Sequence, residues 1–177
     1  SAKTIFPPLP PNSKQTLLIV SAAFLEINFP ALVDPVKEII WVVSRDDKVK
    51  QNRWFDYIDW DYNSYKVRID HNNTEVTDSD RNGEIMRNAK IMFNGLDRIE
   101  IKDNYYYNLI QPYQHHTFIP KEGIYVYSFS LYPENFQPSG CCNMSQINKI
   151  QLYLETIKPL SDEYKYDISI YAVNYNF

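Results

Sequence analysis

The fold is decided by the stretch Ala89-Lys90-Ile91-Met92-Phe93-Asn94-Gly95-Leu96-Asp97-Arg98-Ile99-Glu100-Ile101-Lys102. Asn-Gly between two strand-like runs is a strong cue for a hairpin, because both residues tolerate a positive φ. After the turn, Ile99 and Ile101 alternate with charged residues, which is the period of a β-strand. The stretch therefore predicts an antiparallel β-hairpin.

Further strand patterns occur along the chain, whereas no segment has a convincing helical period. They lie at residues 16–29, 37–43, 124–132, 150–155 and 167–177. In the fourth run Ile150, Leu152 and Leu154 share one face, as expected of a strand with one buried side. About seven or eight strands separated by turns predict an all-β fold, an antiparallel jelly-roll β-sandwich.

The chain of 177 residues has room for one such domain. Four prolines among residues 1–15 predict an extended arm or linker, and residues 16–177 are expected to form a single jelly-roll domain. Residues 45–84 are polar with scattered aromatics and no sustained period. We expect them to form a long loop or insertion with local strand.

Charge and hydropathy exclude several partners. The 18 basic and 22 acidic residues give a net charge of −4, and no basic block is present, so direct nucleic-acid binding is not expected. The apolar runs are too short for membrane insertion, and no signal peptide is visible. Cys141 and Cys142 are adjacent, so a bond between them would be strained, and we expect free thiols in a reducing compartment such as the cytosol.

Motifs for catalysis, cofactors or metals are not found. The four glycines lie in separate turns, so no phosphate-binding loop is predicted. His115 and His116 are neighbours, and on a strand they would point to opposite faces and could not share a metal. The turn at residues 78–83 resembles half of a calcium loop, but Ala89 stands where a bidentate Glu is required, so no tight divalent binding is expected. The sequence predicts no enzyme, no cofactor and no metal site.

A series of motifs in the second half of the chain resembles one known family. They are Asn94-Gly95-Leu96-Asp97-Arg98, Gln111-Pro112-Tyr113-Gln114-His115-His116-Thr117, Gly123-Ile124-Tyr125-Val126-Tyr127-Ser128-Phe129, Gln137-Pro138-Ser139-Gly140 with Cys142-Asn143, and Tyr171-Ala172-Val173-Asn174-Tyr175-Asn176. In order and spacing they resemble the C-terminal jelly-roll of major capsid proteins from nucleocytoplasmic large DNA viruses. The resemblance runs from about residue 17 to the end of the chain.

This resemblance implies a structural virion protein. The family builds double jelly-roll subunits, whose homotrimers form capsomers that tile an icosahedral shell around an internal membrane. The implied partners are other copies of the protein, neighbouring capsomers and minor capsid proteins, and the implied location is the virion capsid, assembled in the host cytoplasm. The chain departs from the family in holding one of the two jelly-rolls, and residues 45–84 do not align.

A group of aromatics in the polar segment is the candidate interface. It consists of Trp54, Phe55, Tyr57, Trp60 and Tyr62. No strand period would bury these side chains internally, so we expect a partner subunit to cover them. Tyr105, Tyr106 and Tyr107 are read as a strand, in which alternation must expose at least one ring. The competing hypothesis is a carbohydrate-binding β-sandwich, in which Trp54 and Trp60 would stack on sugar rings.

Overall fold

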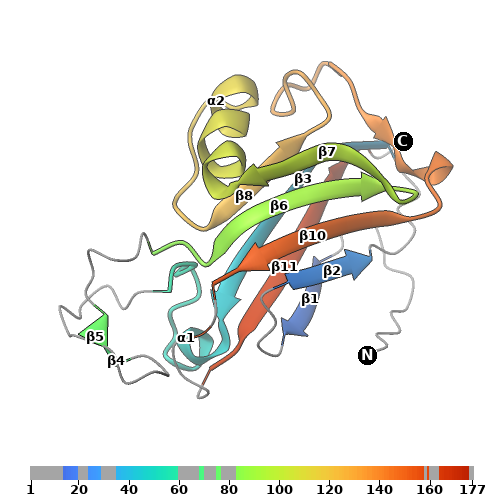
Figure 1. The fold of residues 1–177 in the computed structure, drawn as a ribbon. Helices are drawn as coiled ribbons and strands as arrows, with labels where there is room; N and C mark the ends of the chain where they lie inside the picture. Colours follow the sequence, from blue (N-terminus) through green and yellow to red (C-terminus); the bar gives the residue numbers. More distant parts are fainter. Residues whose placement is uncertain are drawn as a thin grey trace.

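The computed structural model describes residues 14–19, 24–28, 35–59, 68–69, 75–76, 83–157, 159 and 164–175. About half of these residues belong to two antiparallel sheets, which lie one behind the other in Figure 1. The first sheet contains, in spatial order, β1 (Lys14–Ile19), β11 (Tyr166–Asn174), β3 (Pro35–Arg45) and β8 (Ile124–Ser128), and the short β9 (Cys142–Asn143) pairs with β3. The second contains β2 (Phe24–Asn28), β10 (Ile150–Thr156), β6 (Met86–Phe93) and β7 (Leu96–Asp103). A separate pair is formed by β4 (Arg68–Ile69) and β5 (Glu75–Val76).

The strand order is that of a jelly-roll. We number the eight longer strands among the described residues from first to eighth in chain order. The first sheet then has the spatial order 1-8-3-6, and the second sheet has the order 2-7-4-5. The first strand therefore pairs with the last, and nearly every connection crosses from one sheet to the other. The predicted all-β jelly-roll sandwich is confirmed.

The core fills the space between the two sheets. Trp41 of β3 lies at its centre, where its indole nitrogen donates to the sulfur of Met86 on the opposite sheet at 3.4 Å. The predicted alternation of β10 is also confirmed, because Ile150, Leu152 and Leu154 are all buried. Each sheet thus contributes one apolar face, as a sandwich requires.

The predicted hairpin is confirmed with its turn. Asn94 and Gly95 have φ values of +51° and +82°, and Phe93 pairs with Leu96 across the two-residue loop. The strand alternation after the turn is broken, however. A register shift places both Glu100 and Ile101 opposite Lys90, so Ile101 turns to solvent. Such bulges are common in an edge strand, where they twist the free edge away from further pairing.

Two other strand predictions need correction. Residues 16–29 form two strands, β1 and β2, which belong to different sheets. The strand predicted over residues 124–132 ends at Ser128, where the Ser128 hydroxyl donates to the carbonyl of Ser130 at 2.7 Å. The backbone N–H groups of Phe129 and Ser130 both donate to the carbonyl of Lys37, at 2.8 and 3.2 Å, so the regular one-to-one ladder with β3 ends here.

The expectation of an entirely non-helical chain is wrong. The segment 45–59, predicted as loop or strand, contains helix α1 (Asp46–Lys50). After β7, a π-helical turn η2 (Tyr106–Ile110) continues directly into α2 (Gln111–His115), and a short 3₁₀ turn η3 (Met144–Gln146) follows β9. The usual helical pattern is absent from 104–115, because the amides Asn104, Asn108 and Gln111 are buried while Leu109, Ile110 and Tyr113 are exposed.

The Pro-rich arm, apart from its last two residues, lies outside the described residues, as do most residues between 60 and 82. In the parts of the chain that are described, no helix is long and apolar enough to cross a membrane.

Two glycines provide a matched test of turn geometry. Gly95 and Gly123 have nearly the same φ, +82° and +81°, but a Cβ at Gly95 would meet nothing, whereas one at Gly123 would lie 2.6 Å from the Cβ of Tyr57. We expect Gly95→Ala to lower the free energy of unfolding by about 1 kcal/mol, the conformational cost alone. Gly123→Ala should lower the free energy of unfolding by clearly more than Gly95→Ala does. Denaturant unfolding of both variants measures the difference, and equal losses would contradict the close packing at Gly123.

Candidate assembly surface

The segment of residues 104–115 closes the open side of the sandwich. It contacts β7 and β8, the edge strands of the two sheets (Figure 1). Tyr107 is completely buried, with its ring edge against Trp41 at 5.1 Å. Its hydroxyl donates to the carbonyl of Ala89 on β6 at 2.9 Å, so its polar end is satisfied inside the core. The helix is therefore fastened between the sheets by one side chain.

Two amides of the same segment pair with the free edge of β8. The Asn108 side chain donates to the carbonyls of Lys121 and Ile124 at 3.1 and 2.9 Å. The backbone N–H of Ser128 donates to the side-chain carbonyl of Gln111 at 3.0 Å. These bonds stand in for those of another strand, so the edge of β8 is not open to further pairing.

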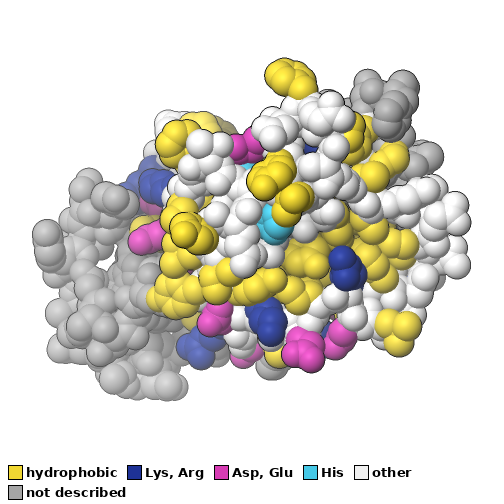
Figure 2. Space-filling view, turned by 90° about the horizontal axis from the view of Figure 1, so that it is seen from above, with side chains coloured by type: hydrophobic (Ala, Val, Ile, Leu, Met, Phe, Trp, Pro, Cys, Tyr) yellow, Lys and Arg dark blue, Asp and Glu magenta, His cyan; other side chains and the backbone are white. Residues whose placement is uncertain are grey.

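The outer side of this helix and the loops beside it form an exposed apolar surface, which we call the helix-side face. Its members are Tyr105, Leu109, Ile110, Tyr113, Phe118, Ile119, Leu131, Tyr132 and Phe136. They are nine of the 14 large apolar side chains that are exposed among the described residues. Figure 2 looks down on this side of the molecule, where hydrophobic side chains run across the view and charged ones lie mainly toward its margins.

An ion pair ties the end of α2 to the first sheet. Nε2 of His116 lies 2.7 Å from a carboxylate oxygen of Glu38 on β3, and both side chains are largely buried. The next residue, Thr117, donates from its backbone N–H to Glu134 at 3.0 Å, and its hydroxyl contacts the same carboxylate. The helix end, the sheet and the loop of residues 129–136 are thereby held together.

Ser139 fixes the loop of residues 129–136 from its other end. Its hydroxyl accepts from the backbone N–H of Tyr132 at 2.8 Å and lies 2.7 Å from the hydroxyl of Ser130. Nδ1 of His115 lies 3.0 Å from the carbonyl of Leu131 in the same loop. The two histidines therefore have separate partners, and their positions follow from a helix end rather than from strand alternation.

The predicted aromatic interface lies at one end of the sandwich. Trp54 and Phe55 are exposed, by 57% and 77%, and Tyr57 is half-buried beneath Gly123. Trp60 and Tyr62 lie outside the described residues. Trp54 and Phe55 thus remain available for an interface, as an exposed pair that follows α1, and we call them the aromatic tip.

A buried polar cluster anchors the segment that carries the tip. Lys48 of α1 is buried and its ammonium lies 2.9 Å from a carboxylate oxygen of Asp56. The guanidinium of Arg45 donates to the carbonyl of Asp59 at 2.6 Å. The Asp59 side chain accepts hydrogen bonds from Tyr164 and Tyr166 at 3.0 and 3.2 Å. Segment 45–59 is therefore an ordered structure.

The remaining motif residues do not join the helix-side face. Asn94 accepts from the backbone of Lys149 at 3.0 Å, and Asn143 accepts from the backbone of Ser145 at 3.2 Å. These contacts shape the turns around β9 and the β6–β7 hairpin. The other motif residues are mostly exposed and lie on or near turns: Arg98, Gln137, Pro138 and Gly140.

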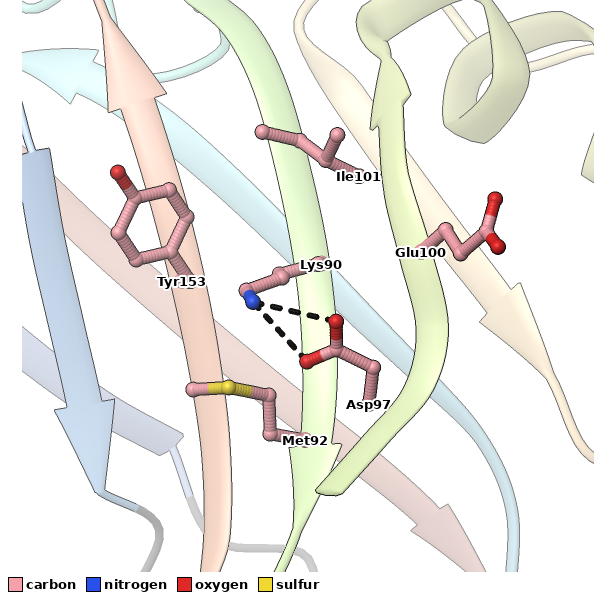
Figure 3. Close-up of a pocket in the computed structure, with 6 residues that line it drawn as sticks. All are labelled: Lys90, Met92, Asp97, Glu100, Ile101 and Tyr153. Atoms are coloured by element: carbon pink, nitrogen blue, oxygen red, sulfur yellow. Dashed lines mark hydrogen bonds and ion pairs between the residues drawn. The ribbon is translucent and has the colours of Figure 1, made fainter. Parts of the chain in front are cut away.

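A shallow hollow of about 560 Å³ lies on the outer face of the second sheet. Figure 3 shows Lys90 of β6 between Asp97 of β7 and Tyr153 of β10, and Glu100 pointing away. The ammonium of Lys90 lies 2.9 Å from the Asp97 carboxylate. Lys90 and Asp97 thus neutralise each other, and Glu100, the third charged residue of the lining, lies 3.9 Å from the ammonium of Lys102.

The chemistry of the described residues gives no second site. No group of three or more potential metal ligands occurs among them. Residues 78–82 of the calcium-like turn lie outside the described part. Cys141 is exposed and Cys142 is half-buried, both without a disulfide, and burial raises the pKa of the Cys142 thiol.

A jelly-roll with large exposed apolar surfaces is typical of proteins that assemble with others. Comparison with known families agrees, because the profile of the large eukaryotic DNA virus major capsid protein family matches residues 12–177. The chain belongs to this family.

Individual relatives support the assignment. The chain is 46% identical over 92 residues to the major capsid protein of Phaeocystis pouchetii virus, covering 50% of this chain and 17% of that one. It is 32% identical over 138 residues to capsid protein 1 of Acanthamoeba polyphaga mimivirus, covering 74% of this chain and 22% of the relative. The chain thus spans about a fifth of the length of these relatives.

Solved structures share the fold. The PBCV-1 virus capsid matches with a TM-score of 0.67 and 24% identity, over 93% of this chain and 46% of that one. The Faustovirus major capsid protein matches with a TM-score of 0.67 and 14% identity, over 90% of this chain and 31% of that one.

Most members of the helix-side face were missed by sequence reasoning, although Tyr113 was named from the family motif. A signal was available in the distribution of charge. Only three of the 45 residues from 104 to 148 are charged, Lys121, Glu122 and Glu134, against 40 in the 177-residue chain. Depletion of charge is a compositional mark of interface cores.

The ion pair between His116 and Glu38 predicts a pH dependence of stability. The hydrogen bond to Glu38 raises the pKa of His116 above its usual 6.5, although burial acts in the opposite direction. The stabilisation is thus complete below about pH 6.5 and is lost as pH rises through the raised pKa of the folded protein. His116→Gln should remove on the order of 1 kcal/mol of unfolding free energy at low pH and less at high pH. Glu38→Gln should remove the same pH dependence of the unfolding free energy. A difference between His116→Gln and the wild type that does not change with pH would contradict the ion pair.

The cluster around Asp59 predicts a large effect from a single carboxylate. Asp59→Ala removes the buried carboxylate that accepts hydrogen bonds from Tyr164 and Tyr166 and lies 3.9 Å from the guanidinium of Arg45, so we expect a loss of about 3 kcal/mol of unfolding free energy. Asp97→Ala is the matched control, because its pair with Lys90 is exposed and should contribute under about 1 kcal/mol. Thermal or denaturant unfolding measures both. Similar losses for the two variants would contradict the anchoring role.

Proposed function

We propose that the chain is a building block of a viral capsid, a domain of a major capsid protein that associates into homotrimeric capsomers. The family match over residues 12–177 carries this proposal. The exposed apolar side chains of the helix-side face and the aromatic tip support it, because a protein that stayed monomeric would rarely expose so much apolar surface.

The proposal includes the setting of the protein. The domain is one half of a double jelly-roll subunit, located in the virion capsid after assembly in the host cytoplasm, with neighbouring capsomers and minor capsid proteins as partners. Its role is structural and not enzymatic. The carbohydrate-binding alternative gains no support from the family match.

The motif residues are proposed to act in folding rather than in chemistry. Gln111 caps the edge of β8, His116 ties the helix end to β3, and Ser139 fixes the loop of residues 129–136. Together they hold the helix-side face in one shape.

Sedimentation of the longer capsid protein that carries this domain tests the proposal. We expect the mass of three subunits, unchanged on dilution to micromolar concentration, whereas the 177-residue chain alone should self-associate or be poorly soluble. Replacing both aromatics of the tip, Trp54→Ser with Phe55→Ser, should weaken association without unfolding the domain. A longer protein that sediments as a stable monomer would overturn the proposed function.

A further inference from the structure

The helix of residues 104–115 turns apolar side chains outward. Its inner side is buried through Tyr107 and the hydrogen-bonded amides of Asn108 and Gln111, while Leu109, Ile110 and Tyr113 project outward. A helix at the surface of a monomer normally turns charged and polar residues toward water, and one that is apolar all round is normally buried. The outer side of this helix therefore has the composition of a buried surface.

The size of the helix-side face matches a stable interface. Its nine large side chains are each at least 39% exposed, and more than half exposed on average. The five aromatic members are about three quarters exposed on average, so at about 150–250 Å² for an aromatic side chain they alone present roughly 550–900 Å² of surface. Each partner in a standard protein–protein interface contributes ~800 Å².

Charge narrows the kind of partner. Nucleic acid and anionic lipid both require clustered Lys or Arg, and Lys121 is the only Lys or Arg between 104 and 148. A strongly charged protein surface would lose its hydration here without gaining ion pairs. A neutral protein surface fits, and a second copy of the same chain meets no charge repulsion at this face.

We propose that the helix-side face is the contact through which one copy of the chain packs against the next copy in the capsomer. This inference rests on the proposed function and names the surface that serves it. A closed ring of three copies uses heterologous contacts, in which one surface of a copy meets a different surface of its neighbour. The helix-side face is one of these two surfaces, held rigid by the contacts of Tyr107, His116 and Ser139.

Charge substitutions on the face test the contact in the longer capsid protein. Tyr113 and Phe118 are each 81% exposed, so Tyr113→Lys and Phe118→Lys should fold normally by circular dichroism and thermal unfolding. Each should raise the dissociation constant of the trimer at least roughly 30-fold, the effect of an interface hot spot. Leu96→Lys is the matched control, since Leu96 is 76% exposed but lies at the β6–β7 turn. It should leave association unchanged.

A cross-link identifies the occupant. A photo-reactive residue in place of Tyr113, in trimers mixed from isotopically light and heavy copies, should yield peptides that join the two kinds of copy. Cross-links confined to one polypeptide, or to another protein, would overturn the inference, as would variants that associate like the wild type. A wild-type trimer with unaffected variants refutes this contact alone, whereas a wild-type monomer refutes the proposed function.

Discussion

The ring of Tyr107 lies between the two sheets at the side where β7 and β8 leave the sandwich open, and the rest of the surface depends on this contact. A two-sheet sandwich has free edges, and each free edge exposes unpaired backbone groups. Here a helix closes the gap. Tyr107 fastens the helix to the core, and Asn108 and Gln111 pair with the backbone of β8. Because its inner side is fixed, its outer side has a fixed shape.

Two polar arrangements extend this order beyond the core, and they differ in kind. At the end of α2, the pair of His116 with Glu38 responds to pH because it includes an imidazole. Below the aromatic tip, the cluster of Arg45, Lys48 and Asp59 is held by hydrogen bonds and an ion pair in the interior and contains no imidazole. Both fix a segment that carries exposed apolar side chains. A surface intended for a partner loses less entropy on binding when it is already ordered.

Sequence patterns predicted the strands because burial on one face leaves a period of two, as in β10, and because Asn94-Gly95 has few alternatives to a tight turn. They failed where burial has another cause. In the helix at 104–115 amides are buried and apolar side chains are exposed, which reverses the pattern by which a surface helix is recognised. α1 was missed because it is only five residues long and its buried residue is Lys48, a charged side chain that is paired with Asp56. Interior ion pairs are decided by tertiary contacts, which periodicity does not encode.

The pairing of β1 with β11 sets the timing of folding. Lys14 is opposite Tyr171, so the first sheet joins strands separated by nearly the whole chain. At a synthesis rate of roughly 5–20 residues per second, β1 leaves the ribosome about 8–30 s before its partner is made. During that interval the first sheet cannot be completed, because β11 is the neighbour of both β1 and β3. The domain therefore finishes folding only after its last strand, β11, has been translated.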